Sequence, residues 1–333
     1  MKLRRRAFLG GLAGLALTTP LAAQTLGGGG DRSQALRVLL GRGSVEPIPG
    51  GFLFAGNRYR GNYRILADGR VVNEVDFDEY LASVVPSEMS ASWPAAALEA
   101  QAICSRGFIL ARSNPNRPYD VVPSELAQVY RGVESEEPAS TAAVRATSGM
   151  VLRYANGFAQ IEYSSCCGGY SESSADAWGA APIPYLVAHP CPYCTASPEY
   201  RWRAKLGAAD LSEGAGQLAP QIGVLEEVTF LDFDRSGRAR SVALSGVANV
   251  ARISASQFRI DVGARKLPSL LVRRQKNLLA PGTQAFAGLH IEGRGLGHGV
   301  GLCQWGARGY ALAKGSAEEI LSFYFVGTSI GRI

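Results

Sequence analysis

The sequence predicts an α+β fold in which mixed β-sheets surround a central helical segment. Strand-like segments separated by turn signals occupy residues 35–74, and two helical patterns follow at 76–112. Strand-like segments return after residue 150, again separated by glycine-containing turns. Strands and helices that are grouped along the chain, instead of alternating regularly, are typical of α+β proteins.

The N-terminal strand-like region predicts a small sheet that leads into the first helix. Asp68-Gly69 is a hairpin signal, because this dipeptide accepts the positive φ angles of a tight turn. Apolar and β-branched residues on both sides supply the strands. The expected strands are residues 36–40, 51–54, 61–66 and 71–72.

Two helices are expected to follow, joined by a short connector. Asp76, with Glu79 three positions later, has the pattern of an N-cap. Pro86 is expected to end this helix, because its ring removes an N–H group and clashes with the preceding turn. Pro94 suits the first position of a second helix, which is expected to run to about residue 112.

Glu88 is the acidic residue of this connector. It is either a solvated loop glutamate, as most glutamates are, or a catalytic acid presented from a constrained bend. Arg106 lies on the apolar arc of the second helix and needs a partner, because an unpaired buried guanidinium is costly. Glu99 on the same arc is one candidate partner, and a cleft beside Glu88 is the other location.

Local signals predict the remaining elements. Asn156-Gly157 predicts a turn between two strands, and Ser316 with Glu319 predicts a capped C-terminal helix. Gln304 is expected to open another helix. Further helices are expected near residues 142–149 and 205–223, and strands at 151–154, 158–163, 228–233, 240–244 and 253–258.

Two glycine-rich segments are candidates for ligand binding. The loop at residues 164–172 combines hydroxyls, glycines and aromatic rings, which suits contact with a sugar and equally an ordinary structured turn. Residues 293–301 carry glycine at every second position, which lets a backbone approach a ligand or another backbone closely. His298 occupies a position where a nucleotide-binding loop would need glycine, so we exclude that function. His298 itself is either packed for structure or part of a site.

The N-terminus predicts export. Arg5-Arg6 precede an apolar run over residues 8–17, and together residues 1–23 have the pattern of a twin-arginine signal peptide. The run is too short for a stable membrane span, although an uncleaved signal would tether the protein. Residues 24–34 include four glycines and are expected to be a flexible linker. We therefore expect an exported protein in the periplasm or cell wall, without a stable membrane span after signal cleavage.

The net charge argues against a nucleic-acid partner. The chain has 34 lysine and arginine residues and 28 aspartate and glutamate residues, and four of the basic residues lie in the expected signal peptide. What remains is 30 against 28, a net charge of +2. Nucleic-acid binding needs a concentrated basic surface, so we expect no nucleic-acid partner.

The six cysteines leave two interpretations open. An even number in an exported protein suggests disulfides, or else free buried thiols. Cys166-Cys167 and the Cys191-x-x-Cys194 motif would also offer four sulfurs to a structural zinc ion. Twin-arginine substrates are usually exported folded, so a metal inserted in the cytoplasm is compatible with export. The remaining cysteines are Cys104 and Cys303.

Ordered blocks of residues resemble the SpoIID/LytB family, which comprises stage II sporulation protein D and the amidase-enhancer proteins. Each block is a weak signal, but together they are specific and span residues 35–331, so we expect one family domain over 35–333. The blocks are Asn73-Glu74, Tyr80-Leu81, Val84 to Met89, Trp93-Pro94, Leu98 to Ala102 with Arg106, Gln128 to Tyr130, Ser165 with Gly168 to Tyr170, Trp178-Gly179, Pro184 to Leu186, and Gly293 to Ala307.

The resemblance implies a glycan-binding cleft and a peptidoglycan lytic transglycosylase. Such an enzyme cleaves glycan strands between MurNAc and GlcNAc and leaves a 1,6-anhydro-MurNAc end. Glu88 matches the family's catalytic acid, and the resemblance implies no cofactor. The expected substrate-binding residues are Arg106, Gln128, Tyr130, Ser165, Gly169, Tyr170, His298 and Gln304.

The alternative is a non-enzymatic wall-binding protein that stimulates an amidase, in which case a wall amidase would be a partner. The presence of Glu88 and Arg106 favours the enzyme. The chain also departs from the family pattern. Some members bind zinc through Cys and His just before the Gln-Val-Tyr block, where this chain has Val122, Leu126 and Ala127. Many members have His where this chain has Ser164. We therefore expect no catalytic zinc, and altered substrate contacts at Ser164.

Overall fold

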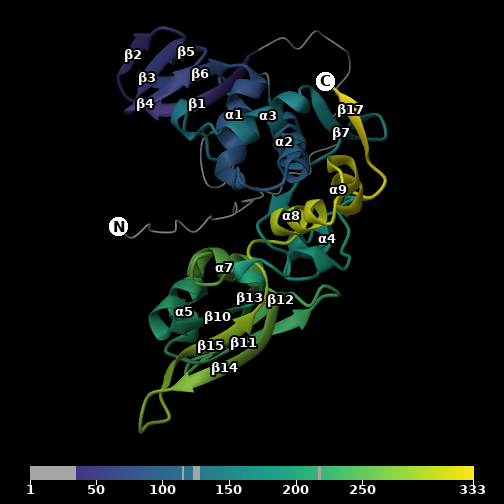
Figure 1. Cartoon of the computed structure of the whole chain (residues 1–333). Coiled ribbons are helices and arrows are strands. Elements are labelled where there is room, and N and C mark those ends of the chain that lie inside the picture. Colours follow the sequence, from purple (N-terminus) through teal and green to yellow (C-terminus); the bar gives the residue numbers. More distant parts are fainter. Residues whose placement is uncertain (1–34, 115, 123–127, 217–218) are drawn as a thin grey trace, which may run out of the picture. The chain divides into compact units, whose positions relative to one another are not determined.

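The structure is a computed structural model that describes residues 35–333, apart from residue 115 and segments 123–127 and 217–218 (Figure 1). The expected signal peptide and linker lie outside the described residues. The chain separates into two compact units. The first comprises the described residues up to Tyr163 together with Tyr310–Ile333, and the second comprises Ser164–Gly309. Helices and several small sheets occur in the chain, which confirms the α+β class.

The N-terminal strands of the first unit form two small antiparallel sheets with orders β1-β6-β5 and β2-β3-β4. Gly69 has a φ of +80° in the turn between β5 and β6, so the hairpin expected at Asp68-Gly69 is confirmed. Strands β2 and β4 were not expected from the sequence. The strands are β1 (Leu36–Arg42), β2 (Val45–Ile48), β3 (Gly51–Phe54), β4 (Asn57–Arg60), β5 (Asn62–Ile65) and β6 (Arg70–Val75).

Helix α2 is the buried centre of the first unit, where it packs against α1, α3 and α9 and against strand β7 (Figure 1). The side chain of Asp76 caps α1 by accepting the N–H groups of Asp78 and Glu79, which confirms the expected N-cap. The elements are α1 (Phe77–Glu88), α2 (Ala95–Leu110), η1 (Val133–Ser135), α3 (Pro138–Ala146) and α9 (Ala317–Tyr324), with a sheet of β17 (Ser329–Arg332), β7 (Met150–Tyr154) and β8 (Gly157–Phe158).

The end of α1 differs from the expected one. The helix continues through Pro86 and ends with Glu88, and the N–H of Met89 still bonds the carbonyl of Val85 at 2.9 Å. Proline removes one helical hydrogen bond here, close to a helix end where few such bonds remain. Val84, Val85 and Met89 are fully buried, and their packing outweighs that loss. Glu88 is therefore fixed by a helix, not by a loop.

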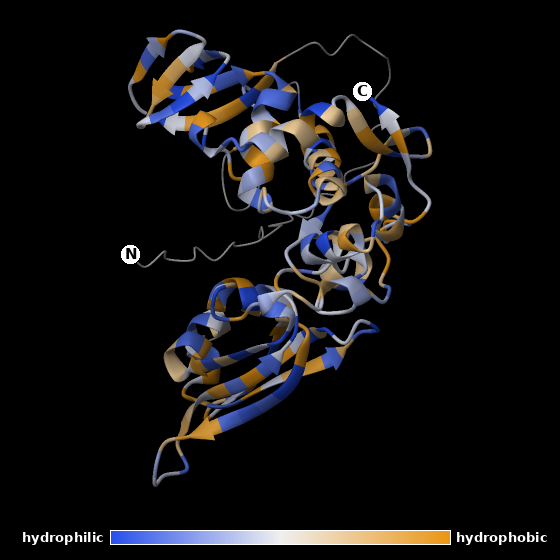
Figure 2. Ribbon diagram, in the orientation of Figure 1, coloured by the Kyte–Doolittle hydropathy of each residue, from blue (hydrophilic) through white to orange (hydrophobic). Residues whose placement is uncertain are grey.

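The second unit contains two antiparallel sheets with orders β11-β12-β13 and β10-β15-β14, and helices α5 and α7 lie together on one side of them (Figure 1). Their strands alternate between hydrophilic and hydrophobic residues (Figure 2), as strands with one buried face do. The elements are β10 (Trp202–Gly207), α5 (Ala208–Ala215), α6 (Ala219–Ile222), β11 (Leu225–Phe233), β12 (Ala239–Gly246), β13 (Val250–Ser254), α7 (Ala255–Val262), β14 (Val272–Leu279) and β15 (Phe286–Gly293).

Two sequence predictions in this unit were wrong. The strand expected at 253–258 ends at Ser254, whose hydroxyl accepts the N–H of Gln257 and so caps α7. A side-chain cap thus overrides a strand-like pattern. The helix expected over 205–223 begins only after strand β10 ends at Gly207. That strand is fixed by its pairing with β15, a long-range contact without a local signal.

The glycine-rich segments of the second unit form compact loops and short elements. Tyr170 bridges to Pro190, and Glu172 bridges to Val300. The elements are β9 (Tyr163–Ser164) and α8 (Gln304–Leu312), each of which crosses a boundary between the units, with α4 (Ser174–Trp178), η2 (Pro192–Cys194), η3 (Pro198–Tyr200) and β16 (Leu302–Cys303). Within the described residues, no helix combines the length and apolar character needed to cross a membrane.

Candidate functional site

Glu88 ends α1 and keeps only 9% of its surface exposed. Two buried tyrosines, Tyr80 and Tyr163, lie close enough for the charge of Glu88 to act on them. Burial raises the pKa of Tyr163 well above its usual value, and the charge of Glu88 adds to this effect. Burial, with Tyr130 and Glu88 as further causes, also raises the pKa of Tyr80. Both phenols are therefore neutral and keep a proton to donate.

Gln128 connects this pair to the neighbouring helix. Its amide nitrogen donates to the hydroxyl of Tyr163 at 3.2 Å and to the backbone carbonyl of Ser105 at 3.1 Å. Among the described residues, neither the amide oxygen of Gln128 nor the hydroxyl of Tyr80 has a hydrogen-bond partner, and both atoms are buried. Gln128 thus orients a phenol beside Glu88 and leaves a buried acceptor available.

Tyr130 packs against the ring of Tyr80. It is buried, its ring centroid lies 4.8 Å from that of Tyr80, and its hydroxyl donates to Asn73 at 2.8 Å. The side-chain amide of Asn73 in turn donates to the backbone carbonyls of Arg60 and Asn62. Tyr130 therefore supports Tyr80 and links it to the N-terminal sheet, which gives it a packing role.

Arg106 is not where the sequence analysis expected it. Its side chain is fully buried and pairs with Asp78 at 2.8 Å, and it also donates to the carbonyls of Thr147 and Met150. Asp78 lies in the first turn of α1, ten residues before Glu88, which is about 15 Å along a helix. The guanidinium is thus at the opposite end of α1 from Glu88. Arg106 therefore pairs with Asp78, 28 residues earlier in the sequence, and not with Glu99, the partner considered from the sequence.

The other expected residues belong to the second unit. Gly169 has a φ of +102°, and its carbonyl accepts the N–H of Cys191 at 3.0 Å. This positive φ explains the glycine, because side chains of L-residues rarely adopt it, and a Cβ atom there would also meet the hydroxyl of Tyr200 at 2.9 Å. Ser165 is buried and its carbonyl accepts the N–H of Trp305.

His298 lies against the ring of Trp178, a residue that the sequence places at the end of the polar loop. The ring centroids of His298 and Trp178 are 5.6 Å apart, and both side chains are half-buried. The Nδ1 atom of His298 accepts the N–H of Val300 at 3.0 Å, so the neutral ring carries its proton on Nε2. Gln304 is buried at the start of α8, and Tyr170 is half-buried.

The expected site residues therefore fall into two sets, and the expected cleft stays a prediction. The first-unit set contains Glu88, Gln128 and Tyr130 around Tyr80 and Tyr163. The second-unit set contains Ser165, Gly169, Tyr170, His298 and Gln304. Of the residues at the family's zinc position, Val122 carries no metal-ligating side-chain atom, and Leu126 and Ala127 lie outside the described residues.

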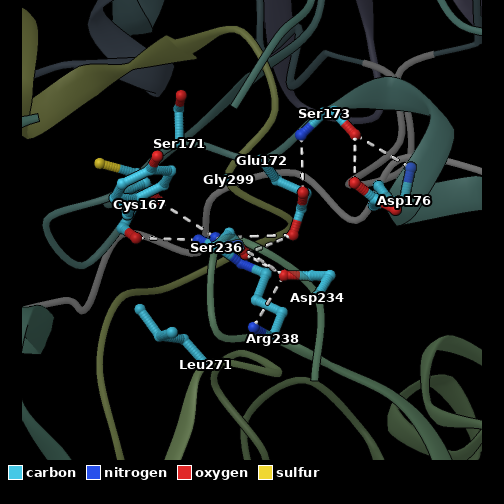
Figure 3. A network of polar contacts seen from close by, with 12 residues as sticks. Cys167, Ser171, Glu172, Ser173, Asp176, Asp234, Ser236, Arg238, Leu271 and Gly299 are labelled. Carbon is cyan, nitrogen blue, oxygen red and sulfur yellow. Dashed lines mark hydrogen bonds and ion pairs between the residues drawn. The ribbon is translucent and has the colours of Figure 1, made fainter. Parts of the chain in front are cut away.

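A buried polar network in the second unit was missed by sequence analysis (Figure 3). Arg238 lies 3.8 Å from Glu172 and donates to the carbonyls of Tyr170 and Cys167. The hydroxyl of Ser236 donates to the same carboxylate at 2.6 Å. Burial raises the pKa of Glu172 to about 7, although the charge of Arg238 opposes this rise. Arg238 follows a turn in the sequence, and no local signal indicates that its partner lies 66 residues earlier.

Comparison with known proteins shows which family the chain resembles. The family model for stage II sporulation protein (SpoIID) matches residues 67–154, the segment that contains Glu88, Gln128 and Tyr130. An uncharacterized protein of Brachyspira hyodysenteriae is 31% identical over 296 residues, which cover 86% of this chain and 76% of the relative.

Two named relatives come from Bacillus subtilis. Stage II sporulation protein D is 26% identical, over 78% of this chain and 76% of its own length. The amidase enhancer is 27% identical, over 75% of this chain but only 40% of its own length. From the family model and the extent of these matches, the chain belongs to the SpoIID/LytB family of stage II sporulation protein D and amidase enhancers.

Proposed function

We propose that this protein is exported and acts on the cell wall, as a peptidoglycan lytic transglycosylase with Glu88 as its acid and base. The observation that carries the proposal is the placement of Glu88. It is a nearly buried carboxyl at a helix end, close enough for its charge to act on two neutral phenols, within the segment that matches the family. Burial favours the protonated form of a carboxyl, which is the form that a general acid needs at neutral pH.

The reaction requires one carboxyl only. Hydrolytic glycosidases use two, because one of them must activate water or attack the sugar. In the proposed reaction, Glu88 donates its proton to the glycosidic oxygen as the bond from C1 of MurNAc to that oxygen breaks. The C6 hydroxyl of the same MurNAc then attacks C1, and the Glu88 carboxylate accepts the hydroxyl proton. The products are a 1,6-anhydro-MurNAc end and a free GlcNAc hydroxyl.

The neighbouring residues would assist without changing charge. The raised pKa values of Tyr80 and Tyr163 keep both phenols protonated throughout the cycle. The neutral phenol of Tyr163 could donate a hydrogen bond to the carboxylate once Glu88 has lost its proton, whereas the Tyr80 hydroxyl has no hydrogen-bond partner among the described residues. Gln128 holds Tyr163 in place through its amide nitrogen. These neighbours would lower the free-energy cost of forming the Glu88 carboxylate during the reaction.

The second-unit set is proposed to bind the glycan. The half-buried rings of Trp178 and His298 offer an aromatic surface of the kind on which sugars pack. The loop that contains Ser165, Gly169 and Tyr170 adds hydroxyl and backbone groups close to the same peptide segment, because Glu172 bridges to Val300. This assignment predicts glycan binding that does not depend on Glu88.

Mass spectrometry of glycan strands incubated with the mature protein tests the proposal. Strands with and without their peptides should be compared, and the wild-type products should end in 1,6-anhydro-MurNAc. Ordinary reducing MurNAc ends would mean that water is the nucleophile and would contradict the mechanism. Glu99→Gln is a matched control for Glu88→Gln, because it makes the same chemical change on the adjacent helix.

A second candidate function is supported by the relative named amidase enhancer. In that case the protein would bind the wall and stimulate an amidase without cutting glycan. Unchanged glycan strands, together with faster release of peptides when a wall amidase is added, would favour this candidate. Glu88→Gln would then leave the stimulation intact.

Export through the twin-arginine pathway is tested separately. Replacing Arg5-Arg6 by two lysines should leave an unprocessed precursor in the cytoplasm, seen as a larger band after fractionation. Normal processing of this variant would contradict the pathway and would leave the enzymatic proposal untouched.

A further inference from the structure

Four cysteines of the second unit converge on one point. The sulfur atoms of Cys167, Cys191, Cys194 and Cys303 all lie within 4.8 Å of one another. All four residues are buried, with at most 1% of their surface exposed. We propose that they bind a single structural zinc ion.

The distances suit one ion at the centre of four sulfurs. A zinc–sulfur bond of about 2.3 Å in a tetrahedron places the sulfurs about 3.8 Å apart. The sulfurs of Cys167 and Cys194 are 3.6 Å apart. Two disulfides would instead draw the sulfurs into two bonded pairs, each about 2.05 Å long. Mutual proximity of all four is the arrangement that a shared ion requires.

The chain supplies the ligands in a way typical of zinc sites. Cys191 and Cys194 come from one Cys-x-x-Cys turn, whose residues Pro192–Cys194 form η2. Cys303 ends strand β16, and Cys167 lies in the polar loop. Gly309 of α8 packs directly on this turn, because a Cβ atom there would lie 2.0 Å from the carbonyl oxygen of Tyr193.

Backbone groups around the sulfurs favour the thiolate form. The sulfur of Cys303 accepts the N–H groups of Cys167 at 3.2 Å and Gly306 at 3.3 Å. Hydrogen bonds to the ligand atoms orient and tune metal sites. Arg238 donates to the carbonyl of Cys167 at 2.8 Å, which places a positive charge beside a site that would carry net negative charge (Figure 3).

The remaining two cysteines provide internal controls. Cys166 precedes a ligand, and its thiol lies 4.0 Å from the carbonyl oxygen of Cys194 and contacts Cys194 and Cys303, but it is not one of the four convergent residues. Cys104 lies in α2 of the first unit and is equally buried. Serine substitution at either position changes a buried thiol without removing a proposed ligand.

The ion would act on structure and not on the reaction. Four protein ligands fill a tetrahedral zinc ion and leave no position for water or substrate. The ion would tie the polar loop beside Gly169 and Tyr170 to the start of α8 at Gln304. The site is therefore compatible with the expectation of no catalytic zinc, and it does not depend on the proposed glycan reaction.

Metal analysis of the purified full-length chain, prepared without chelators, tests the site. We expect about one zinc ion per chain in the wild type, Cys104→Ser and Cys166→Ser, as is usual for structural sites. Cys191→Ser and Cys303→Ser should lose most of the zinc. Retention of zinc by both of these variants would overturn the ligand assignment, and iron in place of zinc would overturn the choice of ion.

A second measurement on the wild-type chain is needed in case the ligand variants fail to fold. Cobalt(II) replacing the ion should give the intense near-ultraviolet absorption of a cobalt–thiolate site and the visible bands of a tetrahedral ion. An octahedral cobalt spectrum would overturn the proposal. So would a metal-free wild-type protein in which mass spectrometry under non-reducing conditions finds these cysteines as disulfides. Neither measurement uses glycan, so failure here is distinct from failure of the proposed function.

Discussion

Two buried glutamates of this protein have different surroundings. Glu172 is 1% exposed, lies 3.8 Å from Arg238 and accepts the hydroxyl of Ser236 and the N–H of Ser173. Glu88 is 9% exposed, sits at the end of a helix, and influences the pKa values of Tyr80 and Tyr163. Glu172 belongs to a polar network that joins the loop at residues 164–172 to the turn that contains Ser236. Glu88 lies at the end of a helix at the edge of the core, where its charge acts on two buried phenols.

This difference separates a structural acid from a candidate catalytic one. A buried carboxyl paired with an arginine is required by the fold, because removing one partner leaves the other buried and unpaired. A carboxyl placed for chemistry contributes little to stability and is expected to be dispensable for folding. Asp78, which pairs with Arg106, belongs with Glu172 in the structural class.

The largest expected effect is on activity, at Glu88. Loss of a positioned acid or base typically lowers the rate by about 10²–10⁴-fold, and we expect this range for Glu88→Gln on glycan strands. The melting temperature should stay equal to the wild-type value or rise. Glycan pull-down should show unchanged binding. A variant that is inactive only because it is unfolded would remove the contrast between Glu88 and Glu172.

The next effect is on stability, at the other end of α1. Arg106→Met should lower the free energy of unfolding by about 3 kcal/mol, the lower end of the range for breaking a buried pair, because Asp78 is partly exposed. Arg64→Met is the matched control, since its pair with Glu74 is at the surface and should cost less than about 1 kcal/mol. Denaturant titration measures both. A stable but inactive Arg106→Met protein would return Arg106 to the glycan site.

The third effect is a pH dependence of stability at Glu172. Its pKa is raised from 4.5 to about 7 in the folded protein, so the folded state holds this proton more tightly than the unfolded state. The stabilisation is full below pH 4.5 and is lost as the pH rises through about 7, for a total of about 3 kcal/mol.

Glu172→Gln should remove this dependence. The unfolding free energies of the wild type and the variant should be measured from pH 5 to pH 8. As the pH rises, the wild-type value should fall relative to the value of the variant. The comparison is between slopes, so a constant offset caused by the new amide does not affect it. Parallel curves would mean that Arg238 keeps Glu172 ionised throughout the range.

Local chemistry accounts for what the sequence predicted well. The cap at Asp76, the turn at Gly69 and the capping box at Ser316 each depend on neighbours within four residues, and all three are present. The prediction that Pro86 ends α1 failed, because the packing of buried Val84 and Val85 with the rest of the core outweighs a local preference.

Long-range contacts explain the other differences. Arg106 selects Asp78, 28 residues earlier, over Glu99 on its own helix. The sequence suggested that both Cys166 and Cys167 could bind a metal together with the Cys-x-x-Cys motif, yet Cys303 joins Cys167 and Cys166 does not. The thiol of Cys166 also contacts Cys194 and Cys303, but Cys166 is not in the set of four whose sulfurs all lie within 4.8 Å of one another. Sequence spacing alone cannot reveal which of two adjacent cysteines lies close to all three of the other sulfurs.

The smallest expected effect concerns the two phenols beside Glu88. Tyr163→Phe loses the hydrogen bond from Gln128 and should destabilise the protein by about 1 kcal/mol. Tyr80→Phe removes a buried hydroxyl that has no hydrogen-bond partner among the described residues, so its stability should equal or exceed that of the wild type.

Activity distinguishes the role of these phenols from simple packing. If Tyr163 stabilises the Glu88 carboxylate during the reaction, Tyr163→Phe should lower kcat about tenfold or less, the effect of losing one hydrogen bond, and leave KM unchanged. Tyr80→Phe should lower kcat less, because the Tyr80 hydroxyl has no hydrogen-bond partner among the described residues. The acidic limb of the pH–rate profile should also move, because the surroundings of the carboxyl become less polar. Phe108→Leu is a suitable control, since that ring packs against Tyr163 at 5.8 Å without a hydroxyl. Unchanged kcat and an unchanged pH profile in both tyrosine variants would mean that burial at the helix end alone prepares Glu88 for proton transfer.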